Sequence, residues 1–367
     1  MGKIPFSLNE NHFHLEVDLE NNSAIIIFRV TDNDFHYHLA ITLSLQNWGN
    51  VMKKSILILA LVILSIGSLF VGVSSITPAD LIDFKSEETQ IFMISRLPRM
   101  VAILLAGAGM SIAGLIMQSL SRNKFVSPTT AGTLDATRLG ILVSMLLFTN
   151  ASMLEKMTVA FVFALAGTFL FMQILNRIKF KDAIFIPLVG MMFGNILSSI
   201  STFFAYKADV IQNMSAWLQG DFSMMMKGRY ELLYISIPVL IVAYLFANRF
   251  TVAGMGEDFS VNLGLHYKRI VNLGLILVAL ITVTVVLTVG VIPFLGLIIP
   301  NIVSIFKGDH LEKTLPHTAL LGALFLLVCD ILGRIIIFPY EIPISLMVGV
   351  IGSGIFLYLL FRRRAYA

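Results

Sequence analysis

Two arginines lie on either side of a Leu-Pro pair, at the start of a long apolar run. Arg96 and Arg99 are followed by residues 100–118, which carry no charge. A guanidinium group presents a fixed fork of N–H donors whose geometry fits a carboxylate. Because both arginines are held at the mouth of the run, they predict a docking site for a protein surface that carries Glu or Asp. The alternative interpretation is that both side chains only extend to the membrane interface.

The composition places the chain in a membrane. Apolar residues make up 57% of its 367 residues and charged residues only 13%, which excludes a soluble globular protein. Runs of roughly 20 apolar residues, enough to cross about 30 Å of hydrocarbon, recur from Ser55 onward and predict an all-α polytopic membrane protein. The ten predicted spans are residues 55–74, 99–119, 132–149, 157–175, 183–206, 230–247, 269–291, 294–306, 315–336 and 343–361.

Lysines and arginines are divided unequally between the two sets of connections that join these spans. Fifteen fall in the set that includes both termini and eight in the other. Because positive charges accumulate on the cytoplasmic side of membrane proteins, both termini are predicted to be cytoplasmic. Arg96, Arg99 and Arg334 are then predicted to lie outside, where three arginines can gather at one mouth.

The predicted spans contain few charged residues and few side chains of the kinds that catalyse reactions or bind metals. Asp330 and Arg334 are four residues apart, so one helix face presents them as an ion pair that we interpret as structural, and Glu341 follows in the next connection. No chain of Asp, Glu and His crosses the spans, which disfavours a proton-coupled carrier. The single cysteine, Cys329, lies in an apolar run, so neither a disulfide framework nor a thiolate metal site is expected.

A second candidate site lies in the longest cytoplasmic connection, residues 248–267. Glu257 and Asp258 begin a short stretch with apolar residues and Gly264 is placed to end it, which predicts a brief surface helix. Such a helix needs a partner, whereas an ordinary capped loop does not. The chain has no Gly-x-x-x-x-Gly-Lys-Ser/Thr loop, so any ATP must be handled by another polypeptide and no cofactor is expected on this chain.

The N-terminal extension, residues 1–51, differs from the rest of the chain. It is polar and mixed in charge, and stretches such as residues 23–30 look like strands without making a domain. Met52 precedes two lysines and an apolar run, so we interpret it as the real start of the native protein and of a permease domain over residues 52–367. No metal site is predicted at the four histidines of the extension, which lack nearby Cys or a carboxylate cluster: His12, His14, His36 and His38.

From about Met52 to its end, the chain resembles the permease subunits of ABC importers for iron-siderophores and vitamin B12. The resemblance rests on separated blocks that occur in family order between residues 96 and 343. These blocks are Arg96-Leu-Pro-Arg99 with Gly107 and Gln118; Arg122-Asn123 with Pro128 and Gly132; Gly256-Glu257 with Leu263-Gly264; residues 290–300; Gly308-Asp309-His310; and Asp330, Arg334, Glu341 and Pro343.

The resemblance implies the type II ABC importer architecture. A ten-helix protomer would pair with a second copy or a related permease around a central pathway, with two ATP-binding subunits below and an extracytoplasmic substrate-binding protein above. Arg96, Arg99 and Arg334 match arginines that pair with glutamates of the binding protein. The ATPase-coupling segment would be residues 254–266, and the family positions in it are Gly256, Glu257, Leu263 and Gly264. The cytoplasmic gate region would contain Asn123 and Phe125.

The chain also departs from the family pattern. Lys124-Phe125-Val126 replaces the usual Pro-Leu-Ala of the gate. Further departures are Asn301 and Ser304 for the usual His and Arg, Ser345 for the usual Gly, and the charged pair Asp135 and Arg138. These differences are interpreted as features of the siderophore branch, in a catecholate or petrobactin-like group.

The predicted function is therefore transport without covalent chemistry. The chain would be the multi-pass permease in the cell membrane that moves an iron-siderophore complex from an external binding protein into the cytoplasm. Importers for cobalamin or haem are the alternatives within the family, and a stand-alone ion-coupled secondary carrier is the alternative from another class. A membrane enzyme is disfavoured because catalytic groups do not cluster anywhere in the sequence.

Overall fold

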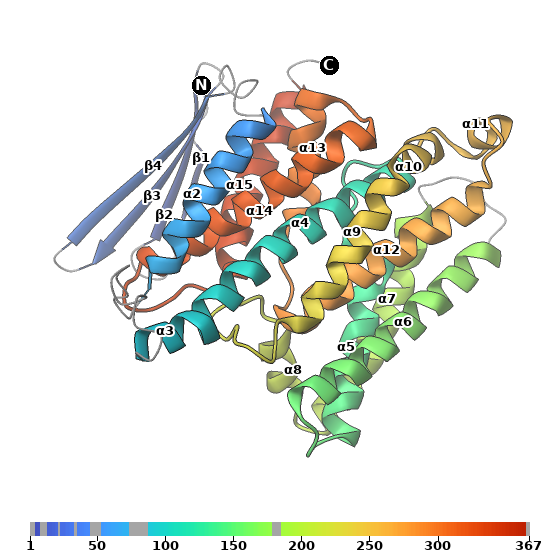
Figure 1. Cartoon of the computed structure of the whole chain (residues 1–367), viewed down its shortest axis with the longest axis horizontal. Helices are drawn as coiled ribbons and strands as arrows, with labels where there is room; N and C mark the ends of the chain where they lie inside the picture. Colours follow the sequence, from blue (N-terminus) through green and yellow to red (C-terminus); the bar gives the residue numbers. More distant parts are fainter. Residues whose placement is uncertain are drawn as a thin grey trace.

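The computed structural model describes residues 4–7, 13–20, 23–32, 35–44, 53–72, 87–177 and 185–364. From Lys54 onward the described elements are all helical (Figure 1). In chain order the elements are β1 (Ile4–Ser7), β2 (Phe13–Glu20), β3 (Ser23–Asp32), β4 (Phe35–Ser44), α2 (Lys54–Phe70), α3 (Glu87–Ile91), the π-helical turn η3 (Phe92–Arg96), α4 (Leu97–Leu120), the 3-10 turn η4 (Pro128–Ala131), α5 (Thr133–Leu147), α6 (Met153–Arg177), α7 (Phe185–Lys207), α8 (Ile211–Leu218), η5 (Glu231–Ile235), α9 (Ser236–Leu245), α10 (Ala247–Ala253), α11 (Glu257–Asn262), α12 (Tyr267–Thr288), α13 (Leu295–Lys307), α14 (Leu311–Ile335) and α15 (Ile344–Arg364).

The described strands correct the expectation for the N-terminal extension. They form an antiparallel sheet in the order β1-β2-β3-β4, with Ile26 opposite both Val17 and Ile41. Strands β2 and β3, like β3 and β4, are separated by two residues, the spacing of a tight hairpin. The β-branched run of β3 and these short connections favour a sheet. The all-α prediction therefore holds only for the permease domain.

Each of the ten predicted spans coincides with a helix, but their lengths differ. Among the described residues, five helices are long and apolar enough to cross a membrane: Thr89–Leu120, Met153–Leu175, Ile186–Lys207, Tyr267–Thr288 and Leu311–Ile335. A sixth span would join Glu231–Leu245 to Ala247–Ala253, which are bent by 62°. α13 has 13 residues and therefore reaches only about 20 Å, less than the bilayer core. The predicted eighth span is thus a half-length helix.

Helix α4 forms the centre of the bundle. Together with α12 it is the most buried of the long apolar helices: 72% of the apolar window of α4 and 78% of that of α12 are buried within the chain, against 22% for α7. Glycines allow neighbouring backbones to approach α4 closely: a Cβ at Gly107 would lie 2.7 Å from Ala323 Cα of α14, and one at Gly114 would overlap Gly296 O of α13. Small residues serve this purpose in membranes, where lipid gives no hydrophobic drive for helix association.

The two ends of the bundle carry different structures (Figure 1). At the α3 end, backbone hydrogen bonds join distant connections: Lys227 N donates to Ile94 O over 3.0 Å, and Ser345 N donates to Gly220 O over 3.1 Å. At the opposite end, the α11 end, lie α11 and the turn between α13 and α14. α4 runs from the first end to the second, so its two termini contribute to both candidate sites.

Candidate functional site

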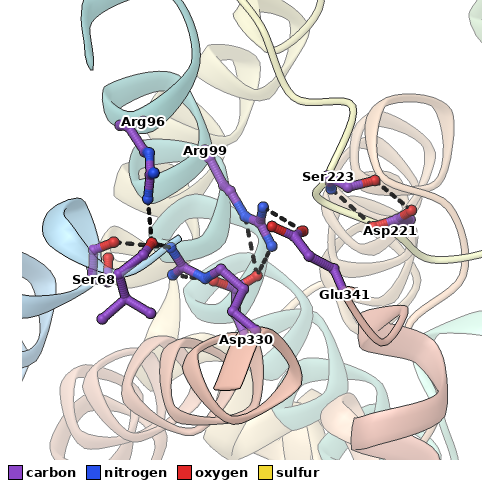
Figure 2. Close-up of polar contacts among 9 residues, drawn as sticks. Ser68, Arg96, Arg99, Asp221, Ser223, Asp330 and Glu341 are labelled. Atoms are coloured by element: carbon purple, nitrogen blue, oxygen red, sulfur yellow. Dashed lines mark hydrogen bonds and ion pairs between the residues drawn. The ribbon is translucent and has the colours of Figure 1, made fainter. Parts of the chain in front are cut away.

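Arg99, in the first turn of α4, is held by two carboxylates at the α3 end (Figure 2). Its Nε and Nη2 donate to Asp330 Oδ1 of α14 over 3.2 and 2.8 Å, and its Nη1 donates to Glu341 Oε2 over 2.7 Å. The Arg99 side chain is 12% exposed. Charge-assisted bonds of this geometry are among the strongest that side chains form.

Arg334, one turn beyond Asp330 on α14, completes the pair predicted from their spacing. Its Nη2 donates to Asp330 Oδ2, while its Nη1 donates to Ser68 O and Val71 O at the end of α2 over 2.9 and 2.8 Å. Both side chains are almost fully buried, with exposed fractions of 3% for Arg334 and 2% for Asp330. Asp330 therefore bridges two guanidiniums and ties α14 to α4 and, through Arg334, to α2.

Arg96 joins the same cluster from the π-helical turn η3. Its Nη1 donates to Val71 O, the carbonyl that also accepts from Arg334 (Figure 2). The side chain is half-buried. The structure thus brings Arg96, Arg99 and Arg334 to one mouth, together with Asp330 and Glu341.

One partner in this cluster was missed by sequence reasoning. Glu341 was placed only in the connection after α14, whereas in the structure it forms an ion pair with Arg99. The two residues are 242 positions apart, so no local spacing relates them. The three arginines and two carboxylates of this set leave one net positive charge.

At the α11 end, segment 122–127 contains the predicted gate residues and is called the gate segment below. It is held by residues that depart from the family pattern. Asn301 Nδ2 donates to Lys124 O over 2.7 Å, and Lys124 Nζ donates to Ser304 Oγ over 2.9 Å. Lys124 Nζ also pairs with Asp309 Oδ1. The departures at three separate positions therefore form one connected set of contacts between the gate segment, α13 and the α13–α14 turn.

The two predicted gate residues, Asn123 and Phe125, adjoin this set. Asn123 Oδ1 accepts from Phe125 N over 2.9 Å and shapes the turn. The Phe125 ring is 50% exposed and packs edge-on against Phe356 of α15 at 6.0 Å between centroids. Phe125 thus lies at the surface of the protomer, between the end of α4 and α15.

The predicted surface helix exists as α11. Gly256 precedes it with φ 120° and Gly264 follows it with φ 78°, so glycine suits both positions. Ser260 Oγ donates to Val252 O over 3.0 Å and anchors the helix to α10. Apolar side chains remain exposed along the segment and are Met255, Phe259, Val261 and Leu263.

A cavity of about 440 Å³ opens beside this segment. Its lining includes Gln118, Arg122, Lys124, Asp309 and His310. A Cβ at Gly256 would lie 3.0 Å from Arg122 Nη2, so the gate segment and the predicted coupling segment approach each other closely. Among the described residues, no group of three or more His, Cys, Asp or Glu side chains could hold a metal ion.

The two ends define a membrane transport component, and sequence comparison gives its family. A model of the FecCD transport family matches residues 56–362, and the chain belongs to this family. It is therefore a multi-pass membrane permease, a transport component rather than an enzyme.

Individual relatives sharpen the assignment. The chain is 68% identical over 316 residues to the petrobactin import system permease protein YclN of Bacillus subtilis, covering 86% of this chain and 100% of that protein. It is 42% identical over 301 residues to the ferric-anguibactin transport system permease protein FatD of Vibrio anguillarum, covering 82% and 96%. A solved metal-chelate type ABC transporter in an inward-facing conformation shares the fold, with a TM-score of 0.74 at 24% identity over 84% of this chain and 98% of that chain.

Proposed function

We propose that the chain is the permease subunit of an ATP-driven importer for a ferric siderophore of the petrobactin class. The 68% identity over the whole length of a petrobactin import permease carries this proposal. The petrobactin import system permease protein FatD of Bacillus anthracis adds support at 40% identity over 309 residues, with 84% of this chain and 91% of that protein covered.

The complex would contain two permeases, two ATP-binding subunits and one extracytoplasmic substrate-binding protein. We place the α3 end outside the cell membrane and the α11 end in the cytoplasm, with both chain termini cytoplasmic, because Lys and Arg are concentrated in the connections of the α11 end. Arg96 and Arg99 would then face the binding protein, and Arg334, which is 3% exposed, would lie behind them in the same cluster. Their presence in one cluster supports this docking role.

The α11 end would receive the ATPase subunits. The exposed apolar side chains of segment 254–266 suit a groove on a partner protein, since water-exposed Phe259 and Leu263 gain by burial. The contact between Gly256 and Arg122 would carry movement from the coupling segment to the gate segment. ATP hydrolysis on the partner would thereby alternate the pathway between its two open states, without covalent chemistry on the cargo.

The test is uptake of iron-labelled petrobactin by cells that lack this gene and by cells complemented with it. We expect uptake to be lost and restored, while uptake of cobalamin and haem is unchanged in both strains. Normal petrobactin uptake without the gene would overturn the proposal. Uptake that continues after the companion ATPase is inactivated would instead favour the ion-coupled carrier.

We also propose that residues 1–51 lie outside the permease domain, which begins at Met52. In support, the family match starts at residue 56, and a relative is covered over its whole length by 316 residues of this chain. The intact mass of the protein purified from its natural source tests this boundary.

A further inference from the structure

The two carboxylates that hold Arg99 are not equivalent. Asp330 is 2% exposed, lies within α14 and also binds Arg334. Glu341 is 26% exposed, lies in the connection between Ile335 and Ile344, and binds Arg99 through its carboxylate. A partner that approaches the α3 end can therefore reach Glu341, whereas Asp330 is shielded.

The segment around Glu341 projects from the bundle. Phe338 and Tyr340 beside it are 63% and 75% exposed. Its base is fixed, because Ile342 N donates to Gly333 O over 3.0 Å and Ser345 N donates to Gly220 O over 3.1 Å. Glu341 thus lies at the C-terminal end of an exposed segment, and the residues that follow it are hydrogen-bonded up to the start of α15.

We propose that Glu341 is an internal competitor for Arg99, and that an acidic side chain of the binding protein replaces it on docking. This inference rests on the proposed function, which supplies the partner. Arg99 would exchange one carboxylate for another of the same geometry, so its charge stays paired throughout, and the buried bonds to Asp330 stay in place. The surface used for recognition is then Arg99 Nη1 together with the segment 337–341.

The exchange also has a structural consequence at the mouth. Once released, Glu341 no longer ties segment 337–341 to α4. That segment is then held at Ile342, whose backbone donates to Gly333 O, and at Ser345, whose backbone donates to Gly220 O. The residues beside Gly220 pair with the 289–291 connection, where Val291 N donates to Leu218 O over 2.9 Å. Docking would therefore loosen a segment that is attached to the connections after α8 and α12.

The experiment compares Glu341→Gln with the unmodified permease in the complete importer, reconstituted in lipid nanodiscs. The probe is the purified binding protein, identified as the secreted protein whose deletion abolishes petrobactin uptake. Because the amide of Gln competes for a guanidinium far less well than a carboxylate, we expect the Kd for docking to fall by about three- to tenfold. Most of the change should appear as faster association, since no internal bond has to be displaced.

The matched control is Glu155→Gln, which removes the same charge near the same end. Glu155 is exposed and accepts from Ser152 N over 2.7 Å, a capping contact that Gln can keep. We expect its Kd to stay within twofold of the unmodified value, while Glu341→Asp keeps the charge and also stays close to it. An unchanged or weakened affinity in Glu341→Gln would overturn the inference. If the unmodified complex failed to bind the protein at all, the proposed docking role itself would be refuted.

Discussion

The buried carboxylate of Asp330 gives the most demanding test of the cluster at the α3 end. Asp330→Ala leaves Arg334, which is 3% exposed, without its carboxylate. Removing one partner of a buried ion pair costs about 3–5 kcal/mol because the remaining charge is left uncompensated. Arg334 keeps two carbonyls of α2 and Arg99 keeps Glu341, so the lower value, about 3 kcal/mol, is expected.

Thermal unfolding of the purified permease in detergent measures this loss. An unfolding entropy of about 2.1 cal/mol/K per residue makes each kcal/mol worth about 1.5 °C in a chain of this size, so Asp330→Ala should lower the Tm by about 4 °C. Glu341→Gln removes a more exposed pair and should cost less than about 1 kcal/mol, or at most about 1.5 °C. The double variant Asp330→Ala/Arg334→Met removes the stranded charge and should recover part of the loss.

The burial argument therefore predicts a larger decrease in Tm for Asp330→Ala than for Glu341→Gln. Equal decreases in Tm for Asp330→Ala and Glu341→Gln would refute the argument from burial. A double variant that is less stable than Asp330→Ala alone would show that Arg334 stabilises the helices chiefly through the α2 carbonyls.

Further substitutions test other contacts. Gly114→Ala should destabilise the fold by about 2–3 kcal/mol in a chemical denaturation assay, because its Cβ would meet the facing carbonyl of α13; unchanged stability would mean that α4 and α13 can separate freely. Lys124→Ala and Asp309→Asn should each cost less than about 1 kcal/mol, and the double variant should cost less than their sum, since both remove one ion pair; strictly additive losses would show that the pair is not formed. Phe259→Asp should reduce co-purification of the ATPase subunits about tenfold without lowering permease expression, and full assembly would contradict the coupling role of α11. Mass spectrometry of the native protein should give a chain that begins at Met52, and a product that begins at residue 1 would exclude that start.

The helices of the permease domain were largely predictable, because the pattern that indicates each helix lies within one continuous segment of the sequence. Apolar runs gave a helix for each expected span, and the acidic start and Gly264 stop gave α11. The i,i+4 spacing of Asp330 and Arg334 gave their ion pair, since both residues belong to one helix. The short length of α13 was predicted as well, because the expected span 294–306 has 13 residues, the number that α13 has.

The contacts that decide the site depend on how separate helices are rotated and packed. The pairing of Arg99 with Glu341 needs the N-terminus of α4 to meet the end of α14, which no single segment encodes. The contacts of Lys124 were not predicted either, although Lys124, Asn301 and Ser304 all differ from the residues usual in the family. The sheet of the extension was not predicted because a sheet depends on the pairing of several strands, and a single apolar stretch such as residues 23–30 does not specify its partners.

The small net charge of the arginine cluster affects the rate at which a binding protein associates with it. Arg96, Arg99 and Arg334 are offset by Asp330 and Glu341, so this set offers an approaching anionic protein only one net charge. Long-range steering accelerates association only when a face carries a strong field, and salt screens such a field within about 8–10 Å. Encounter at this mouth would then proceed at an ordinary diffusional rate that changes little with ionic strength. Loading of the importer would then change little between dilute and salty surroundings.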